Sequence, residues 1–167
     1  ALVAECRRLD VPCVIDPKKV DFAPYAGATV VTPNLLEAER TVGRPLADDE
    51  EAGKAAEELR SALDTDAMLI TRGPQGMTLA LPGAVHHIPS QTRDVADVTG
   101  AGDTVVAVLA ACLGAGWPVA DACRIANTAA GIAVGRPRTY VVQSGELLAA
   151  WGGMSPKILD AVDAARL

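Results

Sequence analysis

The sequence predicts an α/β fold in which helices flank a mostly parallel sheet. Short apolar segments, typical of buried strands, alternate along the chain with longer segments whose apolar residues recur at helical spacing. Half of the 167 residues are hydrophobic and 3% are aromatic, so the core is expected to consist mainly of Ala, Val and Leu. A chain of this length is one domain or a part of one.

Five segments are expected to form strands. They are Val11–Ile15, Ala28–Thr32, Ala67–Thr71, Thr78–Leu81 and Val85–Ile88. Helical segments separate the first three, which predicts parallel pairing among them. Gly83 lies between the last two, which are too close for a helix and are expected to form a β-hairpin.

Three helices are expected in the first half of the chain: Leu2–Leu9, 34–42 and 48–63. Asn34 follows a proline and precedes an apolar segment, so it is expected to cap the second helix. Asp48 or Asp49 is expected to cap the third. The buried face of that third helix is expected to consist of Ala52, Ala55, Ala56, Leu59 and Leu63.

Four helices are expected in the second half: 102–113, 118–133, 144–151 and 156–167. Pro118 fits the first helical position of the second of these. Ser144 is expected to cap the third, which ends before Gly152. The second helix has an apolar stripe made of Val119, Ala122, Cys123, Ala126, Ala129, Ala130 and Ala133.

Charge and cysteine content narrow the function classes. The net charge of −6 argues against a nucleic acid partner. No apolar run reaches the roughly 18 residues of a membrane span, and no signal segment opens the chain. Because the four cysteines (Cys6, Cys13, Cys112 and Cys123) lack metal-site spacing, they are expected to be buried, reduced thiols. These observations favour a cytoplasmic protein.

The stretch Asp97–Thr104 carries the strongest chemical signal. Gly100 and Gly102 lack a Cβ, so the backbone can approach a ligand closely. The N–H groups in the first turn of the helix that follows form an anion site. Asp103 would repel a phosphate held there, but it fits a base beside a phosphoryl group in transfer. The stretch is neither a P-loop nor a dinucleotide fingerprint, because Val105 stands where a third glycine is needed.

Asn34 and Glu37 allow two interpretations. They lie one helical turn apart and could act on Mg²⁺, through water because Mg²⁺ keeps several waters. Alternatively, Asn34 is only a helix cap and Glu37 a carboxylate favoured by the helix dipole. His86 and His87 lie on opposite faces of one strand, and no catalytic role is expected for them.

Four segments, taken together, resemble the ribokinase-like (PfkB) carbohydrate kinases. They are Thr32–Glu37 (an N-x-x-E segment), Thr71–Gly76 (a T-R-G-x-x-G turn), Asp97–Asp103 (the second family signature) and Ala126–Gly131 (a helix beside the adenine). The resemblance implies the three-layer ribokinase-like fold and an ATP-dependent sugar kinase that uses Mg²⁺. It leaves a monovalent cation open, and the segment 136–139 departs from the usual family sequence at that place.

The resemblance also implies site residues. Asp103 would be the base, and Gly100, Ala101 and Gly102 would hold the developing charge. Glu37 and Asn34 would act on Mg²⁺. The residues expected at the nucleotide and its cation are Lys18, Asn34, Glu37, Thr71, Arg72, Gly73, Gly76 and Asn127. For two of them a plainer reading stays open: Lys18 as a solvated loop lysine and Asn127 as a satisfied polar group within a helix.

Within the family, several segments resemble the heptose kinases of ADP-heptose synthesis, which phosphorylate O1 of D-glycero-β-D-manno-heptose 7-phosphate. The segments are 16–18, 21–22, 25–29 and 32–34. Ribose, fructose or another sugar phosphate is the first alternative acceptor. The second alternative is a nucleotide-binding module without activity.

The chain begins within a β/α pattern and without methionine, so a fragment is expected. The resemblance implies that residues 1–152 are the C-terminal, ATP-binding part of a kinase domain whose N-terminal portion and sugar-binding lid are missing. It implies that residues 153–167 form a helix or linker. In bifunctional members such a linker leads to a nucleotidyltransferase domain. We expect the fragment alone to be inactive and to form a homo-oligomer.

Overall fold

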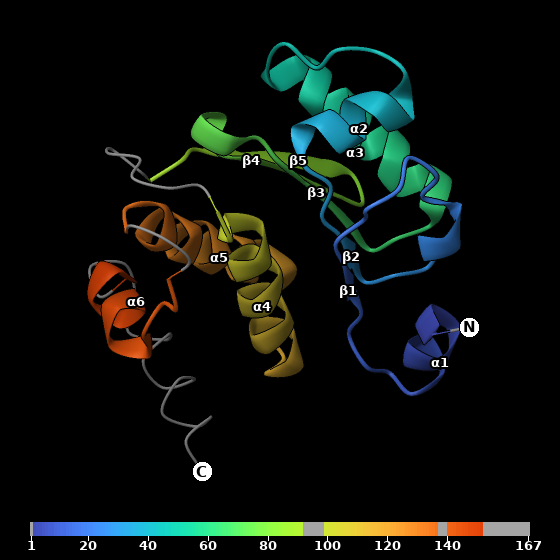
Figure 1. The fold of residues 1–167 in the computed structure, drawn as a ribbon. Coiled ribbons are helices and arrows are strands. Elements are labelled where there is room, and N and C mark those ends of the chain that lie inside the picture. Colours follow the sequence, from blue (N-terminus) through green and yellow to red (C-terminus); the bar gives the residue numbers. More distant parts are fainter. Residues whose placement is uncertain (1, 92–98, 137–139, 152–167) are drawn as a thin grey trace. The chain divides into compact units, whose positions relative to one another are not determined.

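A computed structural model describes residues 2–91, 99–136 and 140–151 (Figure 1). The chain divides into two compact units, Ala1–Ser90 and Gln91–Leu167. The expected helix 156–167, the linker 153–167 and the residues Asp97 and Val98 lie outside the described residues.

The first unit is built on a five-stranded sheet (Figure 1). In spatial order the strands are β1 (Val14–Ile15), β2 (Val30–Val31), β3 (Ala67–Thr71), β4 (Met77–Leu81) and β5 (Ala84–Ile88). β1, β2 and β3 pair in parallel, whereas β4 pairs antiparallel with β3 and with β5. The described sheet is therefore mixed, and the expected hairpin is present.

The helices of the first unit are α1 (Leu2–Arg8), α2 (Leu35–Val42) and α3 (Asp49–Leu63). Two short 3-10 helices, η1 (Ala23–Tyr25) and η2 (Gly73–Gln75), lie in connections. α3 packs on β3, β4 and β5, and α2 packs on β3. The five residues predicted for the face of α3 are all buried, and the small Ala55 and Ala56 bring the helix close to the apolar sheet.

The first two strands are shorter than expected, and for β1 the reason is that neighbouring groups take its backbone hydrogen bonds. The N–H of Val11 donates to the carbonyl of Cys6 over 2.9 Å, which ties this residue back to α1. The N–H of Cys13 donates to Thr29 Oγ1 over 2.9 Å. Strand β1 therefore begins only at Val14.

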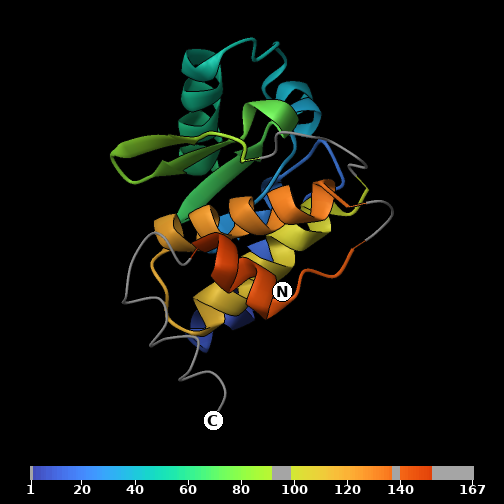
Figure 2. The same cartoon turned by 90° about the vertical axis from the view of Figure 1, so that its left-hand side faces the viewer.

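The second unit consists of α4 (Ala101–Gly114), α5 (Val119–Val134) and α6 (Ser144–Trp151) among its described residues. α5 packs against both α4 and α6 (Figure 2). Most of the apolar stripe predicted for α5 is buried, including Ala122, Ala126 and Ala129. The indole of Trp151 is also buried, at the end of α6.

Two of the expected helix starts differ in detail. Pro118 is the cap of α5 and not its first helical residue. Ser144 is the first residue of α6 and not its cap. The residue before it, Gln143, donates its backbone N–H to the Glu146 carboxylate over 3.1 Å, which satisfies the backbone at the start of that helix. Within the described ranges, none of the helices has the length and apolar character of a membrane crossing.

Candidate functional site

Most of the predicted site residues of the first unit follow the carboxyl ends of its parallel strands. The N–H of Thr32, after β2, donates to the carbonyl of Ile15, the last residue of β1, over 2.8 Å. The N–H of Thr71, at the end of β3, donates to the carbonyl of Pro33 over 2.9 Å. The three strand ends are thereby joined at the edge where open α/β sheets bind ligands.

Asn34 and Glu37 form a capping box at the start of α2. The amide Oδ1 of Asn34 accepts from the N–H of Glu37 over 2.9 Å, and Oε2 of Glu37 accepts from the N–H of Asn34 over 2.8 Å. The predicted cap is confirmed. The box uses one carboxylate oxygen of Glu37, and a carboxylate beside an amide group fits the oxygen ligands and retained waters of Mg²⁺.

The segment 73–76, which we call the glycine turn, follows β3. The N–H of Arg72 donates to the carbonyl of Gly76 over 2.8 Å, and the N–H of Gly76 donates to the carbonyl of Gly73 over 3.0 Å. Gly76 has φ +83°, and a Cβ added there would lie 2.0 Å from the carbonyl oxygen of Ile88. Only glycine fits this position, because any side chain would collide with backbone.

Arg72 enters the interior at the base of this turn. Its side chain is 1% exposed and forms an ion pair with Asp49. A side chain so deeply buried does not reach a ligand at the surface, so the predicted nucleotide contact of Arg72 would have to come from its backbone.

Lys18 follows β1 and lies at the surface. Its ammonium is 2.6 Å from the carboxylate of Asp16, and its side chain is 70% exposed. Pro17, between them, is fully buried and fixes the chain at this point. An exposed lysine paired with one carboxylate fits a solvated loop residue as well as a phosphate ligand, so both readings remain.

The start of α4 in the second unit has a different design. Gly100 precedes the helix with φ +83°, in the left-handed region that glycine adopts without strain. Both the N–H and the hydroxyl of Thr104 donate to the Gly100 carbonyl over 2.9 Å. No side chain caps this helix among the described residues. The N–H groups of its first residues, Ala101 to Asp103, precede the first intrahelical donor and suit an anion.

Asp103 lies in the first turn of α4, and its side chain is exposed. A carboxylate there is favoured by the helix dipole and remains accessible to a proton donor. Asn127 lies in the same unit, in α5, and is 4% exposed. A buried amide must satisfy its polar atoms, so Asn127 fits a structural role as well as the predicted adenine contact.

A model of pfkB family carbohydrate kinases matches residues 2–144, which is most of the chain. The chain belongs to the pfkB family of carbohydrate kinases.

Relatives of this pfkB chain agree with that assignment. Bifunctional protein HldE of Halorhodospira halophila is 50% identical over 153 residues, which are 91% of this chain and 32% of that protein. Bifunctional protein HldE of Geobacter sulfurreducens is 47% identical over 152 residues, with 90% and 31% covered. The chain thus spans about a third of the length of these relatives.

Solved structures show the pfkB fold directly. Phosphofructokinase-2 from Escherichia coli in complex with potassium matches with a TM-score of 0.80 at 18% identity, covering 91% of this chain and 50% of that one. Arabidopsis thaliana ribokinase complexed with ribose and ATP matches with a TM-score of 0.79 at 22% identity, covering 89% and 50%. The ribokinase-like fold predicted from the sequence is confirmed.

The predicted site residues form two groups, one in each unit of the chain. The first unit brings Asn34, Glu37, Thr71 and the glycine turn to neighbouring strand ends, with Lys18 after β1. The second unit holds Gly100–Asp103 and, on another helix, Asn127.

Sequence reasoning missed the partners of Arg72, which are Asp49 and Thr78. The acidic pair at the start of α3 was interpreted only as a cap, and Asp48 does fill that role by accepting from the N–H of Glu51 over 2.8 Å. One feature of the sequence could have indicated this pair. Arg72 directly follows an apolar strand, and a charge in such surroundings requires a partner of opposite charge.

Proposed function

We propose that the protein transfers the γ-phosphoryl group of ATP to a sugar hydroxyl, most specifically O1 of D-glycero-β-D-manno-heptose 7-phosphate. Membership of the pfkB family supplies the reaction class, carbohydrate phosphorylation. The observation that carries the mechanism is the start of α4, whose first turn has no side-chain cap among the described residues and contains the exposed Asp103. An anion site beside a carboxylate base matches what phosphoryl transfer requires.

Different residues of this chain would transfer the proton, stabilise the developing charge and bind the nucleotide. Asp103 takes the proton of the sugar hydroxyl as the hydroxyl oxygen attacks. The N–H groups of Ala101, Gly102 and Asp103 stabilise the charge that develops on the phosphoryl oxygens, with Gly100 holding the loop open. One such donor typically contributes about 3 kcal/mol to the transition state. The glycine turn and Asn127 bind the nucleotide.

The start of α2, after the end of strand β2, fits a Mg²⁺ ion. Glu37 and Asn34 would hold it through water, with one carboxylate oxygen of Glu37 outside the capping box. When bound, the ion neutralises charge on the phosphates. The retained hydrogen bonds between Asn34 and Glu37 keep both side chains in one orientation as the ion binds.

The heptose is favoured over other sugars by the relatives. At 47–50% identity they are HldE proteins, described as bifunctional, and the segments 16–18, 21–22, 25–29 and 32–34 resemble the heptose kinases. A kinase of ribose or of fructose phosphate is the alternative, since the fold neighbours include ribokinase and phosphofructokinase-2. We further propose a fused nucleotidyltransferase domain in the full-length gene product, a homo-oligomer and a cytoplasmic location.

The decisive experiment compares acceptors. The full-length gene product is incubated with MgATP and, separately, heptose 7-phosphate, ribose, fructose and fructose 6-phosphate, with and without K⁺. ADP release is followed, and the product is located by phosphorus NMR. We expect kcat/KM to be highest for the heptose, with the new phosphate at O1. A higher kcat/KM for another sugar would transfer the proposal to that sugar.

The 167-residue chain is assayed beside the full-length product. The chain spans about a third of its relatives, and we expect it to transfer no phosphate to heptose by itself. Measurable turnover by the chain alone would show that it contains every sugar contact that the reaction needs.

A further inference from the structure

Arg72 is a buried charge at the base of the glycine turn. Its Nη1 donates to Oδ1 of Asp49 over 2.5 Å and to Oγ1 of Thr78 over 3.1 Å. Its Nε is buried and has no hydrogen-bond partner among the described residues. Burying a guanidinium is unfavourable unless an opposite charge and hydrogen bonds compensate for the lost water. Asp49 supplies that charge.

The partner carboxylate is accessible, although the arginine is not. Asp49 is the first residue of α3 and its side chain is 65% exposed. The hydrogen bond from Arg72 lowers the pKa of the Asp49 carboxyl, which is therefore ionised at neutral pH. The start of a helix also favours a carboxylate. Because Asp49 projects to the surface, it can be changed without opening a cavity in the core.

Thr78 extends the contact into the antiparallel part of the sheet. Its side chain is fully buried on β4, and Oγ1 lies 3.1 Å from Nδ1 of His87 on β5. Arginine only donates, so the threonine oxygen accepts from Arg72 and its own hydrogen is available to His87. The guanidinium thus joins the start of α3 to β4 and β5.

The backbone of Arg72 continues into the glycine turn. The N–H of Arg72 donates to the carbonyl of Gly76 over 2.8 Å, and its carbonyl accepts from the N–H of Gln75 over 3.1 Å. On its other side the turn is closely packed, because a Cβ added at Gly76 would lie 2.0–2.8 Å from the backbone of residues 88–90. A displacement of the guanidinium would move the Arg72 backbone, and with it the two hydrogen bonds that close the turn.

We propose that Arg72 and Asp49 form a positioning pair that holds the glycine turn in its nucleotide-binding conformation. Neither side chain needs to touch the nucleotide for this role. The pair also lies close to the residues proposed to hold Mg²⁺. Thr71, directly before Arg72, donates its N–H to the carbonyl of Pro33, which precedes Asn34. The inference rests on the proposed function in one respect, the binding of nucleotide by this turn.

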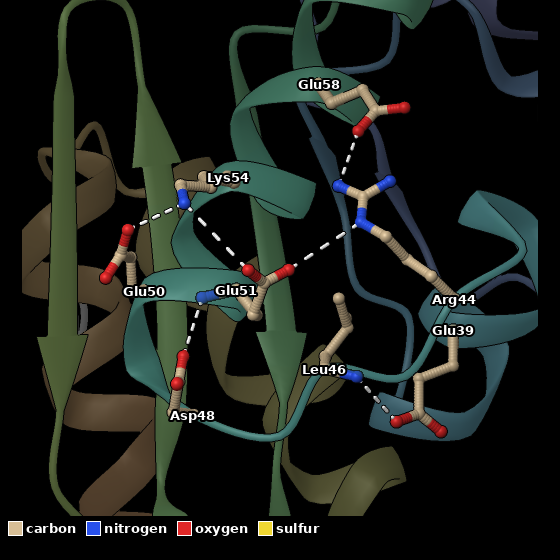
Figure 3. Close-up of polar contacts among 8 residues, drawn as sticks. All are labelled: Glu39, Arg44, Leu46, Asp48, Glu50, Glu51, Lys54 and Glu58. Atoms are coloured by element: carbon tan, nitrogen blue, oxygen red, sulfur yellow. Dashed lines mark hydrogen bonds and ion pairs between the residues drawn. The ribbon is translucent and has the colours of Figure 1, made fainter.

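A second ion-pair cluster on α3 provides the matched control. Arg44, before α3, pairs with Glu58 over 2.7 Å and with Glu51 over 3.8 Å (Figure 3). Arg44 and Glu58 are both exposed by more than a third, and within the described residues no hydrogen bond or ion pair joins either of them to the glycine turn. Exposed pairs of this kind contribute little, because water and salt screen them. Glu58→Gln therefore removes an α3 ion pair without disturbing a buried charge.

The test measures kcat and KM for ATP in the full-length gene product and in four variants: Asp49→Asn, Asp49→Glu, Arg72→Lys and Glu58→Gln. We expect Asp49→Asn to raise KM for ATP about tenfold with little change in kcat, because the turn is proposed to hold the nucleotide equally in the ground state and the transition state. Asp49→Glu should restore most of the affinity, because it restores the charge. Arg72→Lys should give a smaller rise in KM for ATP, and Glu58→Gln should match wild type.

Amide hydrogen exchange provides a second readout. It does not require catalytic turnover, and it can be compared among several variants if one of them fails to fold. Exchange at Gln75 and Gly76 should be faster in Asp49→Asn and Arg72→Lys than in Glu58→Gln. An active wild type whose KM for ATP is unchanged by both substitutions would overturn the positioning pair alone. A wild type that neither binds nucleotide nor transfers phosphate would overturn the proposed function, and the positioning role with it.

Discussion

The starts of α2 and α4 solve the same physical problem in opposite ways. Every helix begins with N–H groups that have no partner within the helix. At α2 the chain supplies partners itself, through the capping box of Asn34 and Glu37. At α4 the cap is Gly100, which has no side chain to offer. The first start is capped by its own side chains, whereas the second has no side-chain cap among the described residues, which suits a phosphoryl group.

The comparison teaches how to separate stability from function at a helix start. Removal of the Asn34 side chain should act mainly on the folding free energy, because its amide caps α2. If the first N–H groups of α4 bind a phosphoryl group, substitutions there should act mainly on turnover. Substitutions at the two helix starts test this division.

Asp103→Asn should lower kcat of the full-length gene product by about 100-fold or more, because it removes the base. Thermal stability should change little, since Asp103 is exposed. The KM for ATP should stay the same or fall, because one negative charge beside the phosphates is lost. Turnover close to wild type in a steady-state kinase assay would remove Asp103 from the mechanism.

Gly102→Ala should move stability and turnover in opposite directions. A Cβ at this helical position meets no atom within 4 Å, and replacing glycine by alanine within a helix stabilises by up to about 1 kcal/mol. The same methyl group stands where the phosphoryl group must approach the backbone, so kcat/KM for ATP should fall at least about tenfold.

Gly114→Ala is the control for this substitution, since it lies in the last turn of the same helix and its Cβ also meets nothing within 4 Å. Thermal unfolding and kinase assays are run on both variants. Equal activity of the two would mean that the start of α4 is not the anion site.

Asn34→Ala should destabilise the fold by about 1 kcal/mol, the usual contribution of a helix cap. Glu37→Gln should leave stability nearly unchanged, because glutamine also completes a capping box. If Glu37 acts on Mg²⁺, the same substitution should raise the Mg²⁺ concentration required for half-maximal activity. Urea unfolding and a Mg²⁺ titration separate these effects. An unchanged titration would reduce Glu37 to a capping residue.

The smallest effect is expected from pH at the start of α3. Arg72 holds the pKa of the Asp49 carboxyl below its ordinary value near 3.8. A carboxyl with a lowered pKa in the folded state stabilises the fold above its unfolded pKa, and this contribution is lost as the pH falls through the folded pKa.

Asp49→Asn should therefore be less stable than wild type at neutral pH, with the difference shrinking below about pH 4. Thermal unfolding of both proteins across this range measures the difference. A difference that stays constant with pH would show that the charge of Asp49 contributes nothing.

Local sequence was sufficient for much of this architecture. The bounds of α2 and α3 follow from Asn34 and Asp48, because a cap acts on N–H groups only two or three residues away. The hairpin at Gly83 follows from two adjacent strand segments, and the site motifs are contiguous along the chain. Each of these features depends on neighbours in sequence.

Features that depend on distant partners could not be predicted in the same way. The β1 segment is three residues shorter than predicted, because Val11 and Cys13 donate their N–H groups to Cys6 and Thr29. Of the two cap candidates, Asp48 caps α3, whereas Asp49 pairs with Arg72, 23 residues farther along the chain. The resemblance placed Gly76 in a turn beside the nucleotide, but glycine is required there for a second reason, because the backbone of residues 88–90 leaves no room for a Cβ.

Residues close together in sequence were sufficient to predict the family, the alternation of helices and strands, the Asn34 cap and the glycine-rich start of α4. Only the tertiary structure decided that the Arg72 side chain is buried in an ion pair with Asp49, that the sheet is mixed, and that Gly76 has no room for a side chain. The physical reason is range: caps and turns are set by hydrogen bonds between near neighbours, whereas burial and charge pairing depend on segments that meet only after folding.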